Sequence, residues 1–218
     1  MKVFMKNLYL KFVKINRIIR FLIISDLFIV GGFALIAPIF AIYITGSIEG
    51  ADLRVLGIAE AVYLFTRSFF QIPAASLIDR IQGDKDNFWA IIVGVSLYAV
   101  VSLSYLIVSS PLQLYLVQFL YGLGAAIAVP AWMSVFMKNV DSQHEGLEWG
   151  VYDTSVGLGS AAAAFFGGVI SDKFGFAPVF ISIAVLSVLG IIMLFFVKNQ
   201  ICFKDVCPNK ESKDDGLQ

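Results

Sequence analysis

Four ionisable side chains lie inside long apolar stretches of this 218-residue sequence: Asp26, Glu60, Arg67 and Asp153. Moving a charged group into a hydrocarbon environment costs at least about 2.5 kcal/mol, so such groups usually face a polar cavity or pair with one another. In proteins that span membranes they bind ions and polar solutes or carry protons. They are therefore the first candidates for a functional site.

The second apolar stretch carries a polar face. Its members, spaced by three, four and four residues, are Glu60, Tyr63, Arg67 and Gln71. This spacing puts side chains on one side of a helix, and that side is poorly suited to contact with lipid. Two interpretations stay open: a cavity wall that binds or gates a substrate, or a structural polar seam between helices or subunits.

Asp26 is the expected internal partner of Arg67. At a rise of about 1.5 Å per residue, Arg67 lies near the middle of its helix and Asp26 lies within reach of its long side chain. Burial favours a neutral carboxyl group, whereas a nearby Arg favours the charged form, so Asp26 fits either proton coupling or a static salt bridge. Asp153, about one turn into the fifth stretch, is expected at a solvated helix end.

Other chemistries lack the residues they need. An intramembrane serine protease that used Ser160 would require a histidine in another helix, and the one histidine, His144, falls in a predicted loop. Cys202 and Cys207 offer too few ligands for a metal site. We therefore expect no enzyme activity, no metal and no cofactor.

The candidate residues must be positioned by helices that cross a lipid bilayer. Hydrophobic residues make up 59% of the sequence and charged residues 15%, which is too apolar for a wetted surface. The formal net charge is zero, with no basic patch for nucleic acid. The apolar stretches, each long enough to span about 30 Å, are residues 18–45, 56–78, 88–108, 112–137, 149–170 and 176–197.

Lysine and arginine are concentrated at both ends of the sequence and in the predicted second loop, and Lys138 lies at the edge of the fourth loop, whereas the opposite loops hold only Arg54 and Lys173. This bias predicts that both termini are cytoplasmic and that the protein lies in the cell membrane. Residues 1–17 interleave apolar residues with lysines, which predicts an amphipathic helix on the inner surface. Residues 18–198 form the predicted transmembrane domain, and residues 199–218 form a polar cytoplasmic tail.

Three local patterns resemble the N-terminal half of the major facilitator superfamily. The first, Ala75-Ser-Leu-Ile-Asp-Arg-Ile-Gln-Gly-Asp-Lys85, is similar to the loop signature between helices two and three of that family. The second, Gln118-Phe-Leu-Tyr-Gly-Leu-Gly124, has Gln118 where the family often has Arg. The third, Gly159-Ser-Ala-Ala-Ala-Ala-Phe-Phe-Gly-Gly168, resembles the antiporter signature with its Gly and Pro replaced by Ala.

The resemblance implies an all-α membrane protein whose six transmembrane helices form a 3+3 inverted repeat, half of a major-facilitator-like bundle. A similarity between Leu77-Ile-Asp-Arg80 and Val169-Ile-Ser-Asp-Lys173, at opposite membrane faces, fits that repeat. It also implies a cytoplasmic gate at Asp79, Arg80 and Gly83. Gln118 and Tyr121 join Asp26 and the polar face as candidates for the substrate or ion pathway.

Small residues and prolines in the helices predict packing and kinks. We expect close helix contacts at Gly122, Gly124, Gly157, Gly159, Gly167 and Gly168. Pro38 and Pro130 should kink helices one and four. Trp89, Trp132 and Trp149 are expected to be interfacial anchors.

These features favour a subunit of a membrane transporter that moves a small solute by alternating access. Because family members have two six-helix halves, the resemblance implies a second half, for which a homodimer is the simplest source and a heterodimer the alternative. A membrane scaffold or accessory subunit that does not transport is the competing hypothesis. The solute, the direction of transport and the coupling ion are not indicated by the sequence.

Overall fold

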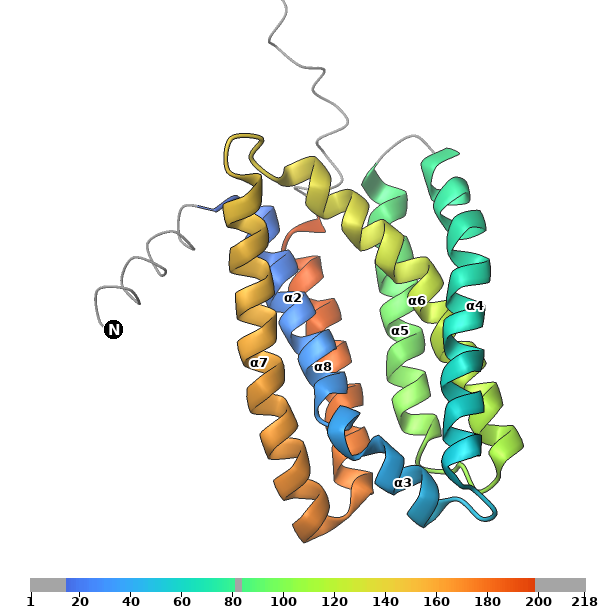
Figure 1. The fold of residues 1–218 in the computed structure, drawn as a ribbon. Coiled ribbons are helices and arrows are strands. Elements are labelled where there is room, and N and C mark those ends of the chain that lie inside the picture. The colour runs from blue at the N-terminus through green and yellow to red at the C-terminus, as the bar shows by residue number, and fades with distance from the viewer. Residues whose placement is uncertain (1–14, 81–83, 199–218) are drawn as a thin grey trace, which may run out of the picture.

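The computed structural model describes residues 15–80 and 84–198, and this part of the chain is helical, with no strands (Figure 1). Its elements are α2 (Arg17–Ala34), η1 (Ala37–Ile39), α3 (Phe40–Ser47), α4 (Leu53–Arg80), α5 (Asp84–Ser104), α6 (Pro111–Asn139), α7 (Glu145–Phe174) and α8 (Phe176–Phe195). Within the described residues, α2 to α3 together and each of α4 to α8 are long and apolar enough to span a membrane. The six predicted spans are therefore confirmed.

The first span is interrupted near its middle. After α2 ends at Ala34, a short 3-10 helix that contains Pro38 leads into α3. Proline has no backbone N–H and its ring clashes with the preceding turn, which breaks the regular α-helical pattern. The predicted kink at Pro38 is present as this break, whereas α6 continues as one helix through Pro130.

Two turns show why the spans end where they do. Pro111 occupies the first turn of α6, where its missing N–H has no helical partner to lose. Gly175 alone separates α7 from α8, with φ of 80°. This left-handed conformation is easily adopted by glycine, which has no Cβ, so the chain reverses direction within one residue.

The helices pack as two groups of three. In one group α2 packs against α7 and α8, and in the other α6 packs against α4 and α5. The groups are joined mainly where α5 meets α8. In chain order, the first span is α2 with α3, and the second to sixth spans are α4 to α8. If the first three spans are exchanged in order with the last three, the contacts within one group become the contacts within the other. This exchange is the pattern of a 3+3 inverted repeat, as the sequence predicts.

Helices α4 and α7 form opposite edges of the bundle, with the other spans between them (Figure 1). They are the least buried of the six spans within the described residues. The beginning of α2 and the end of α8 lie at the same end of the bundle, where the rings of Phe21 and Phe196 stack with centroids 6.0 Å apart. The predicted segments at 1–17 and 199–218 fall outside the described residues, apart from residues 15–17.

Candidate functional site

Asp26 accepts a hydrogen bond across the helix boundary between α2 and α7. The hydroxyl of Tyr152 donates to Oδ2 of Asp26 at 2.6 Å. Both residues are half-buried, and the second carboxyl oxygen, Oδ1, has no hydrogen-bond partner among the described residues. One oxygen of the carboxyl group is thus held in place while the other remains available.

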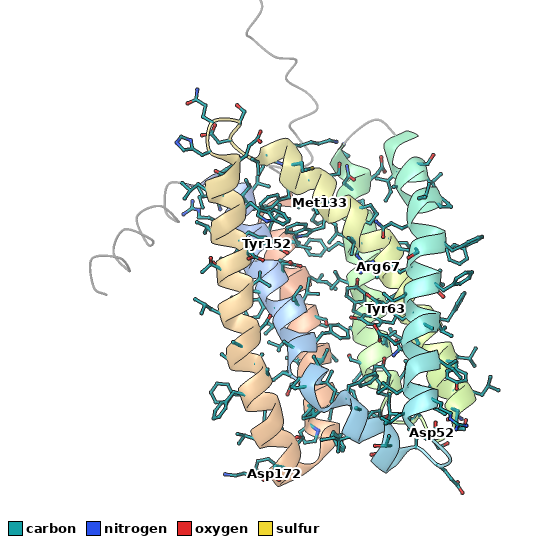
Figure 2. The ribbon with its side chains drawn as sticks, viewed as in Figure 1. Asp52, Tyr63, Arg67, Met133, Tyr152 and Asp172 are labelled. Atoms are coloured by element: carbon teal, nitrogen blue, oxygen red, sulfur yellow. The ribbon has the colours of Figure 1, made fainter. Side chains whose placement is uncertain are left out.

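This carboxyl group lines a cavity of about 200 Å³ between α2, α5, α6 and α7. Four aromatic residues share the lining: Tyr98, Trp132, Trp149 and Tyr152. The rest of the wall is aliphatic apart from Met133, which Figure 2 labels near the same height as Tyr152. The site therefore combines one acidic group with an apolar and aromatic wall.

The aromatic wall is held together by contacts between α6 and α7. The ring centroid of Trp132 lies 4.9 Å from that of Tyr152 and 5.0 Å from that of Phe136. Trp149 lies 5.1 Å from Tyr152 by the same measure. Trp132 is only 9% exposed, so the anchor role that we predicted for it is wrong. It belongs to the core because it lies two turns inside the end of α6.

The predicted ion pair between Asp26 and Arg67 is not formed. Arg67 instead donates from Nη1 to the hydroxyl of Tyr63, one turn earlier on α4, at 3.5 Å. Between described residues, the ion pair that the structure records is His144 with Asp141, on the surface. The predicted depths of Asp26 and Arg67 along their helices are compatible with a pair. However, Asp26 belongs to the group of α2, α7 and α8, and Arg67 belongs to the group of α4, α5 and α6.

The predicted polar face of α4 is divided between the outer surface of the protomer and the interior of the bundle. Glu60 is exposed, whereas Tyr63, Arg67 and Gln71 are half-buried. Figure 2 shows Tyr63 and Arg67 at mid-height on α4, across the bundle from Tyr152 on α7. The structure thus brings Tyr63 and Arg67 together but leaves Glu60 apart from them.

Tyr63 continues into a stack of rings at the centre of the bundle. Its centroid lies 4.5 Å from that of Tyr121, which lies 4.9 Å from that of Phe33 on its other side. Tyr98 meets Tyr121 edge-on at 5.3 Å. Tyr98 also lines the Asp26 cavity. A chain of ring contacts from Tyr63 through Tyr121 to Tyr98 therefore connects the candidate residues of α4 and α6 with that cavity.

Gln71 lines a second cavity of about 420 Å³ between α4, α5 and α6, together with Asn87 and Ser134. Val129 and Met133 line both this cavity and the one at Asp26, so the two cavities are neighbours. Gln118 is 2% exposed and its Oε1 has no partner among the described residues. It is therefore a buried amide in the core of the bundle, outside the lining of either cavity.

With this geometry established, comparison with known proteins identifies the family. The sequence model of the Major Facilitator Superfamily matches residues 22–211. The chain belongs to the major facilitator superfamily. It is thus a multi-pass membrane protein of a transporter family.

The chain is similar to several facilitator proteins over most of its own length. It is 29% identical over 183 residues to an uncharacterized MFS-type transporter of Methanocaldococcus jannaschii, covering 84% of this chain and 45% of that protein. It is 30% identical over 166 residues to the inner membrane transport protein YajR of Escherichia coli, covering 76% of this chain and 35% of that protein. This chain therefore spans less than half the length of the curated relatives it matches.

A solved structure shows the same fold. The crystal structure of the POT family transporter PepTSo superimposes with a TM-score of 0.71 at 18% sequence identity, and the match covers 92% of this chain and 40% of that one. The six helices thus correspond to part of a larger facilitator chain. At this identity the similarity concerns the fold alone.

The small residues of the facilitator motifs divide into two sets. An added Cβ at Gly122 would lie 2.8 Å from Thr66 Cβ, and one at Gly124 would lie 3.1 Å from the Gly94 carbonyl oxygen. An added Cβ at Gly159 would overlap Leu27 of α2, and one at Gly167 would overlap Leu35, the residue that follows α2. Gly157 and Gly168 have no described atom within 4 Å of that position, so the packing expected of them is not found within the described chain.

The facilitator loop signature begins in the last turns of α4. Gly83 lies outside the described residues, as do the side chains of Asp79 and Arg80 at the end of α4. The gate that the resemblance implies at these residues stays a prediction.

The structure also revises the beginning of α7 and adds residues that the sequence interpretation missed. Because α7 begins at Glu145, Asp153 lies about two turns inside the helix, and it is exposed there. Tyr152 and Trp132 were not predicted as site residues. The available signal was the spacing of Trp149 from Tyr152 and of Trp132 from Phe136, which puts aromatic pairs on one face of α7 and of α6.

Proposed function

We propose that this chain is one six-helix half of a transporter that moves a small solute across the cell membrane by alternating access. The observation that carries this proposal is the exposure of Glu60 on α4 and of Asp153 on α7. Carboxyl groups within spans are poorly tolerated against lipid, so the side of the bundle that carries them must face a polar cavity or another protein. A second six-helix half on this side provides both.

Stripes of small residues next to these carboxyl groups support a helical partner. On α7, Gly150, Gly157 and Ala161 are exposed, and Gly57 and Ala61 are exposed on α4. None of these glycines has a described atom near its missing side chain. Small residues at helical spacing allow close approach of helices in membranes, and they offer lipid little contact.

The simplest partner is a second copy related by a two-fold axis along the membrane normal. Such an axis lets α4 of one copy face α7 of the other at two equivalent contacts. Helix α7 supplies Trp149 and Tyr152 to the Asp26 cavity, so in this arrangement the helix borders both the cavity and the second copy. The bias of Lys and Arg towards the predicted second and fourth loops and both ends supports cytoplasmic termini.

Alternating access is tested by the reactivity of a cavity residue from each side of the membrane. Val30 lines the Asp26 cavity and is 40% exposed. In a background that lacks Cys202 and Cys207, V30C in proteoliposomes of defined orientation is treated with an impermeant maleimide from either side. Labelling from both sides is expected of a transporter.

Labelling of V30C from one side only would contradict alternating access and favour a scaffold. Leu22, which is fully buried on the same helix, gives the matched control, and L22C should stay unlabelled. The mass of the purified protein in mild detergent separates a homodimer from a monomer or a heteromer.

A further inference from the structure

The carboxyl group of Asp26 lacks a cationic partner. Within residues 15–80 and 84–198 it accepts one hydrogen bond, from Tyr152, and no Lys or Arg forms an ion pair with it. A carboxylate at this depth is costly without a compensating charge. That cost is removed either by protonation of the carboxyl group or by a bound cation, and the cation is the alternative that a ligand can supply.

The walls of the cavity restrict the chemistry of that ligand. Tyr98, Trp132, Trp149 and Tyr152 line it with Asp26, and most remaining contacts are aliphatic. Aromatic rings attract cations over their faces, most strongly in tryptophan, and apolar walls favour an apolar body over a hydrated metal ion. An apolar cavity of about 150 Å³ holds benzene. The present cavity, of about 200 Å³, therefore has room for one ring and a small ammonium group.

The cavity is also accessible from outside the protomer. Trp149 is 44% exposed and Val30 is 40% exposed, and both contribute to its lining. They belong to α7 and α2, and α7 is one of the two helices against which the proposed second half would pack. A ligand could therefore enter from the space between the two halves.

We propose that this cavity binds a small organic monocation with an apolar body, with Asp26 as its counter-ion and the tryptophan and tyrosine rings around its charge. The proposal rests on the proposed transport function and names the class of solute for it. Tyr152 is a positioning residue, because its hydrogen bond fixes one carboxyl oxygen and leaves Oδ1 for the cation.

Binding is tested on the full chain in detergent with two compounds of the same shape. Phenyltrimethylammonium carries a permanent positive charge, and tert-butylbenzene is its neutral isostere. The fluorescence of Trp132 and Trp149 reports occupancy once W89F removes the third tryptophan of the chain. The cation should cause a saturable change, with affinity at least about tenfold above that of the neutral compound.

Variants assign the effect to Asp26. D26N should weaken cation binding by about tenfold or more and leave binding of tert-butylbenzene within about twofold. D172N makes the same charge change at an exposed residue near the other end of α7 and should leave both affinities within about twofold. D26E keeps the charge and should keep the preference for the cation, which separates loss of charge from misfolding.

Equal affinity for the two compounds, or cation binding that D26N leaves unchanged, would overturn the proposal. These outcomes differ from failure of the transport function. If V30C is labelled from one side only while the cation binds through Asp26, the transport proposal fails and the ligand class stands. If V30C is labelled from both sides and the cation does not bind, the reverse holds.

Discussion

At the scale of single residues, the hydrogen bond between Tyr152 and Asp26 is the polar contact that joins α7 to α2 at the cavity. Hydrogen bonds between helices in membranes contribute modestly, because the separated helices also find partners. The contact therefore fixes the direction of the carboxyl group more than it stabilises the bundle. Its effect should be visible in stability as well as in binding.

Replacing Tyr152 with Phe should lower the free energy of unfolding by about 1–2 kcal/mol, since the ring contacts remain and one hydrogen bond is lost. Unfolding in mixed micelles with increasing dodecyl sulfate measures this change. Y115F is the matched control, because the Tyr115 hydroxyl has no hydrogen-bond partner among the described residues. A loss as large in Y115F as in Y152F would show that the hydrogen bond is not the cause.

A second residue-scale prediction concerns the turn before α7, outside the spans. The backbone N–H of Gln143 donates a hydrogen bond to Oδ1 of Asp141 at 3.0 Å, and Nδ1 of His144 lies 2.8 Å from Oδ2 of the same carboxyl group. These two contacts lower the pKa of Asp141 below its ordinary value of 3.8. Because the pKa is lower in the folded turn, the ionised carboxyl group of Asp141 stabilises the turn at pH values above 3.8. This stabilisation is lost as the pH falls through the folded pKa. His144→Ala should raise the Asp141 pKa, measured by NMR titration of the side-chain carboxyl carbon. An unchanged midpoint would show that His144 contributes nothing.

The residue scale is also where prediction from sequence was weakest. Depth along each helix follows from a constant rise per residue, and it put Asp26 and Arg67 at compatible levels. The rotation of one helix about its axis relative to another depends on packing, which a single sequence does not specify. For that reason Tyr152 was missed as the partner of Asp26.

At the scale of elements, α7 packs tightly at Gly167 against the backbone of Leu35, the residue that follows α2. An added Cβ at Gly167 would overlap the carbonyl group of Leu35. A backbone atom cannot move aside as a flexible side chain can, so the two helices would have to separate. The adjacent Gly168 faces open space within the described chain.

Gly167→Ala should therefore destabilise the protomer by about 1–3 kcal/mol, the usual cost of overpacking. G168A, which adds the same atom one residue along the same helix, should change stability by less than about 0.5 kcal/mol. Both values come from the same unfolding titration in micelles. Equal losses in the two variants would mean that the α2–α7 contact does not determine the difference.

The identity and approximate limits of the helices were predictable, because turn residues and apolar length determine them together. The glycine-rich motif of α7 was harder to interpret, since glycines for internal packing and glycines on the free surface look alike in sequence. Gly159 contacts Leu27 of α2 and Gly167 contacts Leu35 just beyond it, whereas Gly157 and Gly168 have open space beside them. Only the rotation of α7 in the bundle separates the two sets.

At the scale of the whole molecule, the exposed faces of α4 and α7 carry both carboxyl groups and small residues. In the proposed dimer, α4 of one copy lies along α7 of the other. Ser68 on α4 and Ala161 on α7 are both exposed and lie at similar depths by rise per residue. They are therefore suitable positions for a test of the arrangement.

Two differently tagged chains, one with S68C and one with A161C, are co-expressed without the native cysteines and oxidised. A disulfide should join S68C of one chain to A161C of the other, and gel analysis for the two tags detects it. Disulfides between two S68C chains are not expected, because the two-fold axis keeps the α4 helices apart. If S68C chains join each other and the mixed pair does not form, the proposed arrangement is wrong.

The break in the first span has a mechanical consequence. On one side of the break, α2 is attached to α7 through Asp26 and Tyr152. On the other side, Tyr43 of α3 donates a hydrogen bond to the carbonyl oxygen of Tyr105, the residue that follows α5. Residues 35–39 between them can act as a pivot, because no continuous α-helical hydrogen bonding stiffens the chain there. Asp26 lies about 16 Å from this pivot, so a tilt of about 15° in α2 would carry its carboxyl group about 4 Å sideways while α3 stays in place.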